Sequence, residues 1–109
     1  MLPAKNRLNV LEAKEGMKTA FRGRFFAIKW RLNNLPYMRA GVVIGKKYSP
    51  LAVRRNALKR EIFHVFEEGL RSGNVLMGKD IVVLVLTNQQ DFSDNTEEYI
   101  KELSNVLHI

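Results

Sequence analysis

The spacing of apolar side chains near the start of the chain favours a helix. Over residues 10–21 four apolar side chains recur three or four positions apart, namely Val10, Ala13, Met17 and Phe21. Gly23 is expected to end this helix, although Gly16 inside the segment is a poor helix former. Residues 1–9 before it are predicted to form an extended basic lead-in.

Two extended segments follow. Residues 24–32 alternate between an apolar face, which holds Phe26, Ile28 and Trp30, and a largely cationic face, and this period of two predicts a strand. Residues 33–36 have the composition of a turn. Residues 39–47 are predicted to form a second strand, and we expect the two strands to pair as an antiparallel hairpin.

A longer helix is predicted after the second strand. Ser49 and Pro50 are typical of a helix start, with serine as the N-cap and proline at the first helical position. The helix is expected to run to about Glu68 and to end at Gly69. Its predicted apolar stripe consists of Leu51, Leu58, Ile62, Val65 and Phe66.

The last part of the chain predicts one more strand and one more helix. Residues 81–86 are a continuous aliphatic run, which is typical of a strand inside a sheet. Asp94, with Glu97 three positions later, resembles a capping box and predicts a helix through about Leu107. The predicted fold class is therefore α+β: one α/β sandwich domain over residues 1–109, with a small central sheet and helices.

Composition narrows the class of protein. A chain of 109 residues with 46% hydrophobic residues is expected to form one folded domain. Its aliphatic run at 81–86 is far shorter than the roughly 20 residues of a membrane span, and its start lacks signal-peptide features. The absence of cysteine excludes disulfides and thiolate metal sites and fits a cytoplasmic protein.

Charge is distributed very unevenly along the chain. Residues 1–60 carry 15 basic and 2 acidic side chains, whereas residues 61–109 carry 3 basic and 9 acidic ones, and the net charge is +7. From Gly16 to Arg60 there are twelve cations and no Asp or Glu. Such self-repulsion is unfavourable unless a polyanion neutralises it, so the expected partner is a nucleic acid.

The predicted long helix places part of this charge on one side. At 100° per residue, Arg55, Asn56, Lys59 and Arg60 occupy one flank beside the apolar stripe. Arginine binds phosphate with two parallel donors, so this flank is predicted to contact the phosphates of a nucleic acid. The other residues predicted to bind the nucleic acid are Lys46, Lys47 and Arg54. The alternative interpretation is that these cations only solvate the helix.

A second candidate site combines aromatic and cationic side chains. Such groups on an open sheet face bind single-stranded nucleic acid by stacking and by attraction to phosphate. The predicted members, from the first helix and the first strand, are Met17, Phe21, Phe25, Lys29 and Arg31. The alternative is that Met17 and Phe21 simply fill the core.

Residues 46–60 resemble the signature of the bacterial ribonuclease P protein component. The family motif has paired lysines that close a strand, then Ala-Val, Arg-Asn-Arg, an aliphatic residue and Lys-Arg. Here the motif begins with Lys46 and Lys47 and ends with Lys59 and Arg60, and the second arginine of Arg-Asn-Arg is Ala57. A basic position three residues after Lys-Arg is occupied by Phe63.

The resemblance implies a fold and a function. Members of this family form an α/β sandwich with a left-handed βαβ crossover, like a domain of certain ribosomal proteins. They bind the ribonuclease P RNA through the basic helix, and a cleft between the sheet and the first helix receives the 5′ leader of precursor tRNA. The RNA, with Mg²⁺ that it mainly binds itself, hydrolyses the phosphodiester bond. On this basis the two candidate sites are the RNA-binding site and the leader-binding cleft.

Neither a catalytic nor a metal site is predicted on the protein. Metal-dependent phosphodiester hydrolysis needs clustered carboxylates, which residues 16–60 lack, and Asp80, Asp91 and Asp94 suit turn and capping roles. No membrane and no obligate protein partner are expected. The alternative functions are a non-enzymatic RNA-binding module, such as a ribosomal protein or assembly factor, and a DNA-binding regulator.

Overall fold

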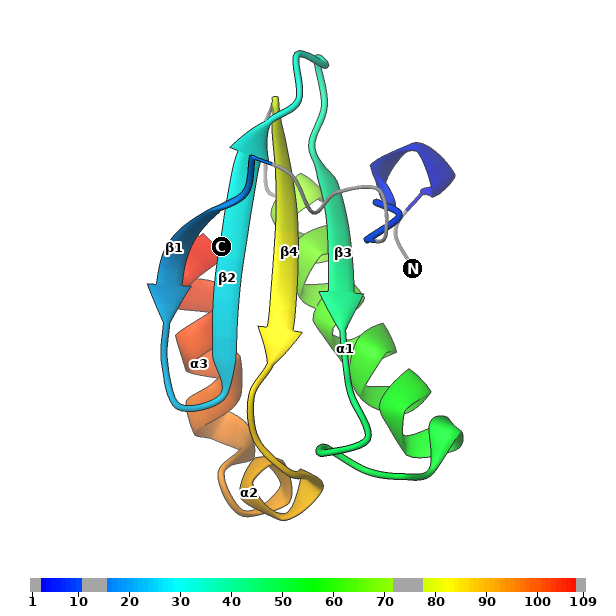
Figure 1. Ribbon diagram of the computed structural model, residues 1–109, viewed down its shortest axis with the longest axis vertical. Helices are drawn as coiled ribbons and strands as arrows, with labels where there is room; N and C mark the ends of the chain where they lie inside the picture. Colours follow the sequence, from blue (N-terminus) through cyan, green and yellow to red (C-terminus); the bar gives the residue numbers. More distant parts are fainter. Residues whose placement is uncertain (1–2, 11–15, 72–77, 108–109) are drawn as a thin grey trace.

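The computed structural model describes residues 3–10, 16–71 and 78–107 as one layer of strands backed by helices. The sheet has four strands in the order β1-β2-β4-β3. Figure 1 shows α1 and α3 behind this sheet and α2 at its lower end. The elements are η1 (Ala4–Asn6), β1 (Lys18–Arg22), β2 (Phe26–Leu32), β3 (Arg39–Val43), α1 (Ala52–Arg71), β4 (Lys79–Val85), α2 (Gln89–Asp94) and α3 (Thr96–Leu107).

The aliphatic strand β4 lies inside the sheet, as its composition predicts. It pairs antiparallel with β2 and parallel with β3. In Figure 1 both β3 and β4 point down, β4 lies to the left of β3, and α1 connects them behind the sheet. When this view is rotated in the plane of the page until both strands point up, β4 lies to the right of β3 and α1 is still behind the sheet. This arrangement makes the crossover left-handed. The resemblance implied this handedness, which is the rarer one.

The predicted hairpin between the first two extended segments is wrong. β2 and β3 are not neighbours, because β4 lies between them. The turn itself forms where it is predicted: Asn34 has a φ of 58°, and the Asn33 side chain accepts a hydrogen bond from the Leu35 N–H at 2.8 Å. β4 is the most apolar strand, so its burial between two neighbouring strands is the most favourable arrangement.

The predicted helix over residues 10–21 is also wrong in the part that the structure describes. Lys18–Arg22 is the edge strand β1, which pairs antiparallel with β2 across a hairpin at Gly23. Gly16 has a φ of 75°, which interrupts helical geometry immediately before the strand. Residues 11–15 lie outside the described part of the chain. Ahead of them, η1 replaces part of the predicted extended lead-in.

The helix boundaries differ from prediction for local reasons. Helix α1 starts at Ala52, because the Leu51 carbonyl accepts the first helical hydrogen bonds, from the Arg54 and Arg55 N–H groups, and it runs to Arg71. Ser49 instead stabilises the preceding turn, since its hydroxyl oxygen accepts a hydrogen bond from the Leu51 N–H at 3.2 Å.

The predicted capping box at Asp94 does not form. Asp94 is the last residue of a short helix, α2, that the sequence did not predict. The N-cap of α2 is Asn88, whose side-chain oxygen accepts a hydrogen bond from the Asp91 N–H at 3.0 Å. Helix α3 begins after Asn95, whose carbonyl accepts a hydrogen bond from the Tyr99 N–H at 3.1 Å.

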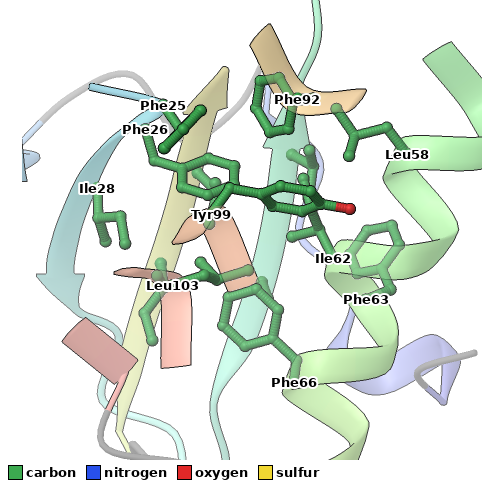
Figure 2. Close-up of a cluster of buried hydrophobic side chains, with 14 of the residues drawn as sticks. Phe25, Phe26, Ile28, Leu58, Ile62, Phe63, Phe66, Phe92, Tyr99 and Leu103 are labelled. Carbon is green, nitrogen blue, oxygen red and sulfur yellow. The ribbon is translucent and has the colours of Figure 1, made fainter. Parts of the chain in front are cut away.

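An aromatic cluster fills the space between the sheet and the helices (Figure 2). The ring of Phe92 lies 5.3 Å from Phe25, 5.5 Å from Phe26 and 4.7 Å from Tyr99, in edge-to-face arrangements. The Tyr99 hydroxyl donates a hydrogen bond to Glu61 on α1. Burial, with this hydrogen bond and the charge of Glu61, raises the pKa of Tyr99. The cluster therefore joins α1, α2 and α3 to β2.

Strand register assigns the side chains to two faces of the sheet. The core face lies against α1 and α3. We call the other one the second face, and its members follow from the strand pairs: Thr19, Arg22, Ala27, Lys29, Arg31, Arg39, Gly41, Val43, Asp80, Val82 and Leu84. Part of the second face is covered, because Ala27 is 2% and Val82 5% exposed. The partly exposed members of this face include Lys29, Arg31 and Arg39, so a ligand of the face meets these long side chains.

Candidate nucleic-acid interface

The cations of the predicted RNA-binding motif surround the start of α1. Lys46 and Lys47 were predicted at the end of a strand, but β3 ends at Val43; both lysines lie in the turn between β3 and α1 and are exposed. The first turns of α1 extend past the end of β3 (Figure 1). A group on this helix, which we call the basic flank, spans an arc of about 140° and consists of Arg55, Asn56, Lys59 and Arg60. The helix and the turn therefore present their cations at one end of the molecule.

These cations are not neutralised within the described part of the chain. None of the ion pairs there involves the basic flank, Arg54, Lys46 or Lys47. By contrast, Arg24 on the hairpin forms ion pairs: its Nη2 atom lies 3.9 Å from Asp91 Oδ1, and its Nη1 atom lies 3.7 Å from Glu98 Oε2. The positive field at the start of α1 is therefore available to an external anion.

Arg55 has a structural role in addition. Its Nη1 atom donates a hydrogen bond to the Ser49 carbonyl at 2.9 Å, which ties the basic flank to the turn that carries Lys46 and Lys47. Arg54 occupies a different side of α1, near Tyr48. Burial and Glu61 raise the pKa of Tyr48, and the charge of Arg54 opposes this rise.

The apolar stripe of α1 agrees with prediction only in part. Leu58, Ile62 and Phe66 are buried. Leu51 is 52% exposed, because it precedes the first residue of α1, and the start of this helix extends past the end of β3. Phe63, at a position that is basic in the family motif, is 3% exposed and belongs to the core. The Lys59 Nζ atom lies 5.8 Å from the centre of its ring.

The structure divides the predicted leader-binding residues. Lys29 and Arg31 lie on the second face, as predicted. Phe25 does not, because it is 1% exposed and packs in the aromatic cluster, so no RNA base reaches its ring. Phe21 pairs with Ile28 and packs against the core cluster, as the alternative interpretation held. Met17 is half-buried just before β1, and the first helix that was to complete the cleft is absent over residues 18–21.

Sequence reasoning missed a charged cluster on the second face. Asp80, at the start of β4, is fully buried and accepts hydrogen bonds from Arg31, Arg39 and Asn33 at 2.8–3.0 Å. Burial raises the pKa of Asp80, but these hydrogen bonds and the charge of Arg39 outweigh it and lower the pKa below its usual value. No spacing signal along the chain links these residues, since β2, β3 and β4 meet only in the folded sheet.

Two further features complete the description of the surface. A groove of about 530 Å³ lies between α1 and α3, and its lining includes Ile62, Val65 and Leu103. The described residues contain no group of three or more His, Asp or Glu side chains arranged to hold a metal ion. None of the helices in the described ranges is long and apolar enough to cross a membrane.

Comparison with known proteins gives consistent matches. The family model "Ribonuclease P" matches residues 13–108. The ribonuclease P protein component of Pseudanabaena sp. is 36% identical over 117 residues, which cover 99% of this chain and 98% of that protein. The Thermotoga maritima protein component is 37% identical over 71 residues, or 65% of this chain and 56% of that one. A solved structure of the RNase P protein from Thermotoga maritima superimposes with a TM-score of 0.70 at 27% identity and covers 94% of this chain and 96% of that one.

Proposed function

The chain belongs to the family of ribonuclease P protein components, subunits of the tRNA-processing holoenzyme, and we propose that it binds the ribonuclease P RNA through the start of α1. The observation that carries this proposal is the set of cations in the basic flank and the preceding turn that no described carboxylate neutralises. Phosphates of a folded RNA provide the missing counter-charge. The proposed place of action is the cytoplasm.

We further propose that the assembled enzyme holds the 5′ leader of precursor tRNA against the second face. Lys29 and Arg31 support this role, because both are cationic, partly exposed and on the same side of β2. The aromatic members of the predicted cleft do not support it, since Phe21 and Phe25 face the core. The leader contact that we propose is therefore electrostatic and does not use stacking on these two rings.

We propose that the RNA, and not the protein, carries the catalytic centre for phosphodiester hydrolysis. Mg²⁺ prefers carboxylate and water oxygens, and the polar side chains of residues 46–60, around the start of α1, are cations, one amide and two hydroxyls. Asp80 is the only carboxylate among the second-face residues named above, and both of its oxygens already accept hydrogen bonds. These residues do not fit a magnesium site, so we propose that the RNA binds the ion that promotes hydrolysis.

Reconstitution tests the function. The full chain is mixed with a ribonuclease P RNA at low Mg²⁺, and cleavage of precursor tRNA is measured against the RNA alone. We expect cleavage at the 5′ end of the mature tRNA to be stimulated, because the protein supplies cations that the RNA otherwise takes from salt. RNA binding without any stimulation would favour a non-enzymatic RNA-binding module instead. A matched variant for the assay is Arg60→Ala, with Lys101→Ala on α3 as the control.

A further inference from the structure

We propose that Trp30 and two lysines beside it, Lys18 and Lys79, form a binding site for one unpaired nucleotide of the ribonuclease P RNA. The site lies on the core face at the end of β2, where β1 and β4 begin. This inference rests on the proposed function, to which it adds a second contact with the same RNA, away from the basic flank.

Strand pairing places the three side chains next to one another. Trp30 is the register partner of Lys18 on β1, so the two side chains lie side by side on the same face. On the other side of β2, Lys79 of β4 is the register partner of Leu32, two residues after Trp30. The Lys79 Nζ atom lies 4.9 Å from the centre of the Trp30 ring. The indole therefore has a lysine on each of its two neighbouring strands.

A hollow lies beside the indole. Its volume is about 250 Å³, and its lining consists of Gly16, Lys18, Trp30, Arg31 and Leu32. Lys79 is not part of this lining, so the hollow lies on the β1 side of the ring, away from the lysine that already contacts it. Trp30 is only partly buried and Leu32 is 68% exposed, so a base can reach the ring from solvent.

The chemistry of the site suits a nucleotide. An accessible aromatic ring stacks on a base, and ammonium groups beside it attract the phosphates of the same strand. Neither Lys18 nor Lys79 forms an ion pair with a carboxylate of the described residues. An inorganic anion or an acidic side chain would use the charge and leave the ring unused. The combination of ring and cations therefore indicates a base with its phosphates.

The position of the site assigns the nucleotide to the ribonuclease P RNA. A leader held by Lys29 and Arg31 lies on the second face, on the other side of the sheet from Trp30. The seven residues of β2 span about 20 Å, and Lys46 and Lys47 lie beyond the opposite end of the sheet (Figure 1). A large folded RNA can contact both ends at once, so the two contacts belong to the RNA that docks on the protein.

Tryptophan fluorescence tests the site directly, because Trp30 is the only tryptophan of the chain. Stacking of a base on the indole quenches its fluorescence. We expect saturable quenching when the full chain is titrated with a single-stranded oligoadenylate or with ribonuclease P RNA, and little quenching with inorganic polyphosphate of equal charge. Equal quenching by polyphosphate would mean an anion site without stacking and would overturn the inference, as would an absence of quenching by both RNAs.

Variants separate stacking from charge in the binding of ribonuclease P RNA. We expect Trp30→Leu to weaken binding about tenfold and Trp30→Phe less than about threefold, because phenylalanine retains an aromatic ring. Lys18→Gln is expected to make the salt dependence shallower by roughly 0.7 in log–log slope, as for one phosphate of a single strand. Lys101→Gln, an exposed cation on α3, is the matched control, with less than about a twofold effect.

The outcomes distinguish this site from the proposed function. Equal affinities of Trp30→Leu and Trp30→Phe, or a loss confined to precursor tRNA that carries a leader, would overturn the inference. If Trp30→Leu does not fold, the quenching titration and Lys18→Gln, a change at an exposed side chain, still decide it. Stimulated cleavage without quenching would overturn the site and keep the proposed function. Quenching by ribonuclease P RNA without stimulated cleavage would overturn the proposed function and keep the site.

Discussion

Single residues show how position in the fold decides the role of a charge. Arg60 and Arg31 look alike in the sequence, yet Arg60 is exposed on α1 and makes no ion pair with a described carboxylate, whereas Arg31 is held by buried Asp80. Phe63 shows the same principle in reverse, because a position that is basic in the family motif is here part of the core. Arg55 combines both roles, since it belongs to the basic flank and also holds the Ser49 carbonyl.

Arg60→Ala is therefore the cleanest test of the basic flank. We expect weaker binding to ribonuclease P RNA and a salt dependence shallower by roughly 0.7–0.9 in log–log slope, because one phosphate contact is lost. Binding isotherms over a range of salt concentrations measure both quantities. Lys101→Ala, an exposed cation on α3, is the control. If Arg60→Ala matches the unmodified protein in affinity and slope, the flank does not contact the RNA.

At the scale of elements, patterns within one segment predicted its secondary structure better than they predicted which strands pair. The period-two segment at β2, the aliphatic strand β4 and the long helix α1 form as predicted, because each signal lies within one element. The sequence predicts a helix where the edge strand β1 forms, since four apolar residues at helical spacing outweigh the alternation of a five-residue strand. Helix α2 is only six residues long and has no repeating apolar pattern to detect.

Gly41 on β3 provides a test of how the chain start is attached to the sheet. A Cβ atom at this position would lie 2.6 Å from Val10 Cγ2 and 3.2 Å from the Leu8 carbonyl oxygen. We expect Gly41→Ala to lower the free energy of unfolding by about 1–3 kcal/mol, because the packed segment must shift. Urea unfolding measures this change.

The matched control is Gly45→Ala, since a Cβ atom there meets nothing within 4 Å. Its effect is expected to stay within about 0.5 kcal/mol. Equal stability of the two variants would mean that residues 8–10 do not pack on β3 in solution.

At the scale of the whole molecule, one buried carboxylate holds one end of the sheet together. Asp80 joins the end of β2 to the starts of β3 and β4, and the turn after β2 is attached through Asn33. The pKa of Asp80 is lowered in the folded protein. Its ionised form therefore contributes stability above the unfolded pKa, and this contribution is lost as the pH falls through and below that value.

Acid unfolding tests this contribution. At pH 6 we expect Asp80→Asn to reduce the free energy of unfolding by about 2 kcal/mol, less than for a fully buried pair because the arginines reach solvent. Below the ordinary carboxyl pKa of 3.8 the difference from the unmodified protein is expected to shrink, since Asp80 of the unfolded chain then binds a proton that the folded protein, with its lowered pKa, binds only at a lower pH. Urea unfolding at pH 6 and pH 3 measures both. A difference that is the same at the two pH values would contradict this role.

The amino-acid sequence by itself determined where the charge lies along the chain, the basic motif of residues 46–60 and the long helix that carries most of it, because these depend on neighbours within one segment. Only the tertiary structure decided that β4 separates β2 from β3, that Phe21 and Phe25 face the core, and that Asp80 meets Arg31 and Arg39. The physical reason is that strand order and register result from competition among distant segments for burial and hydrogen bonds, and spacing along the chain does not record its outcome.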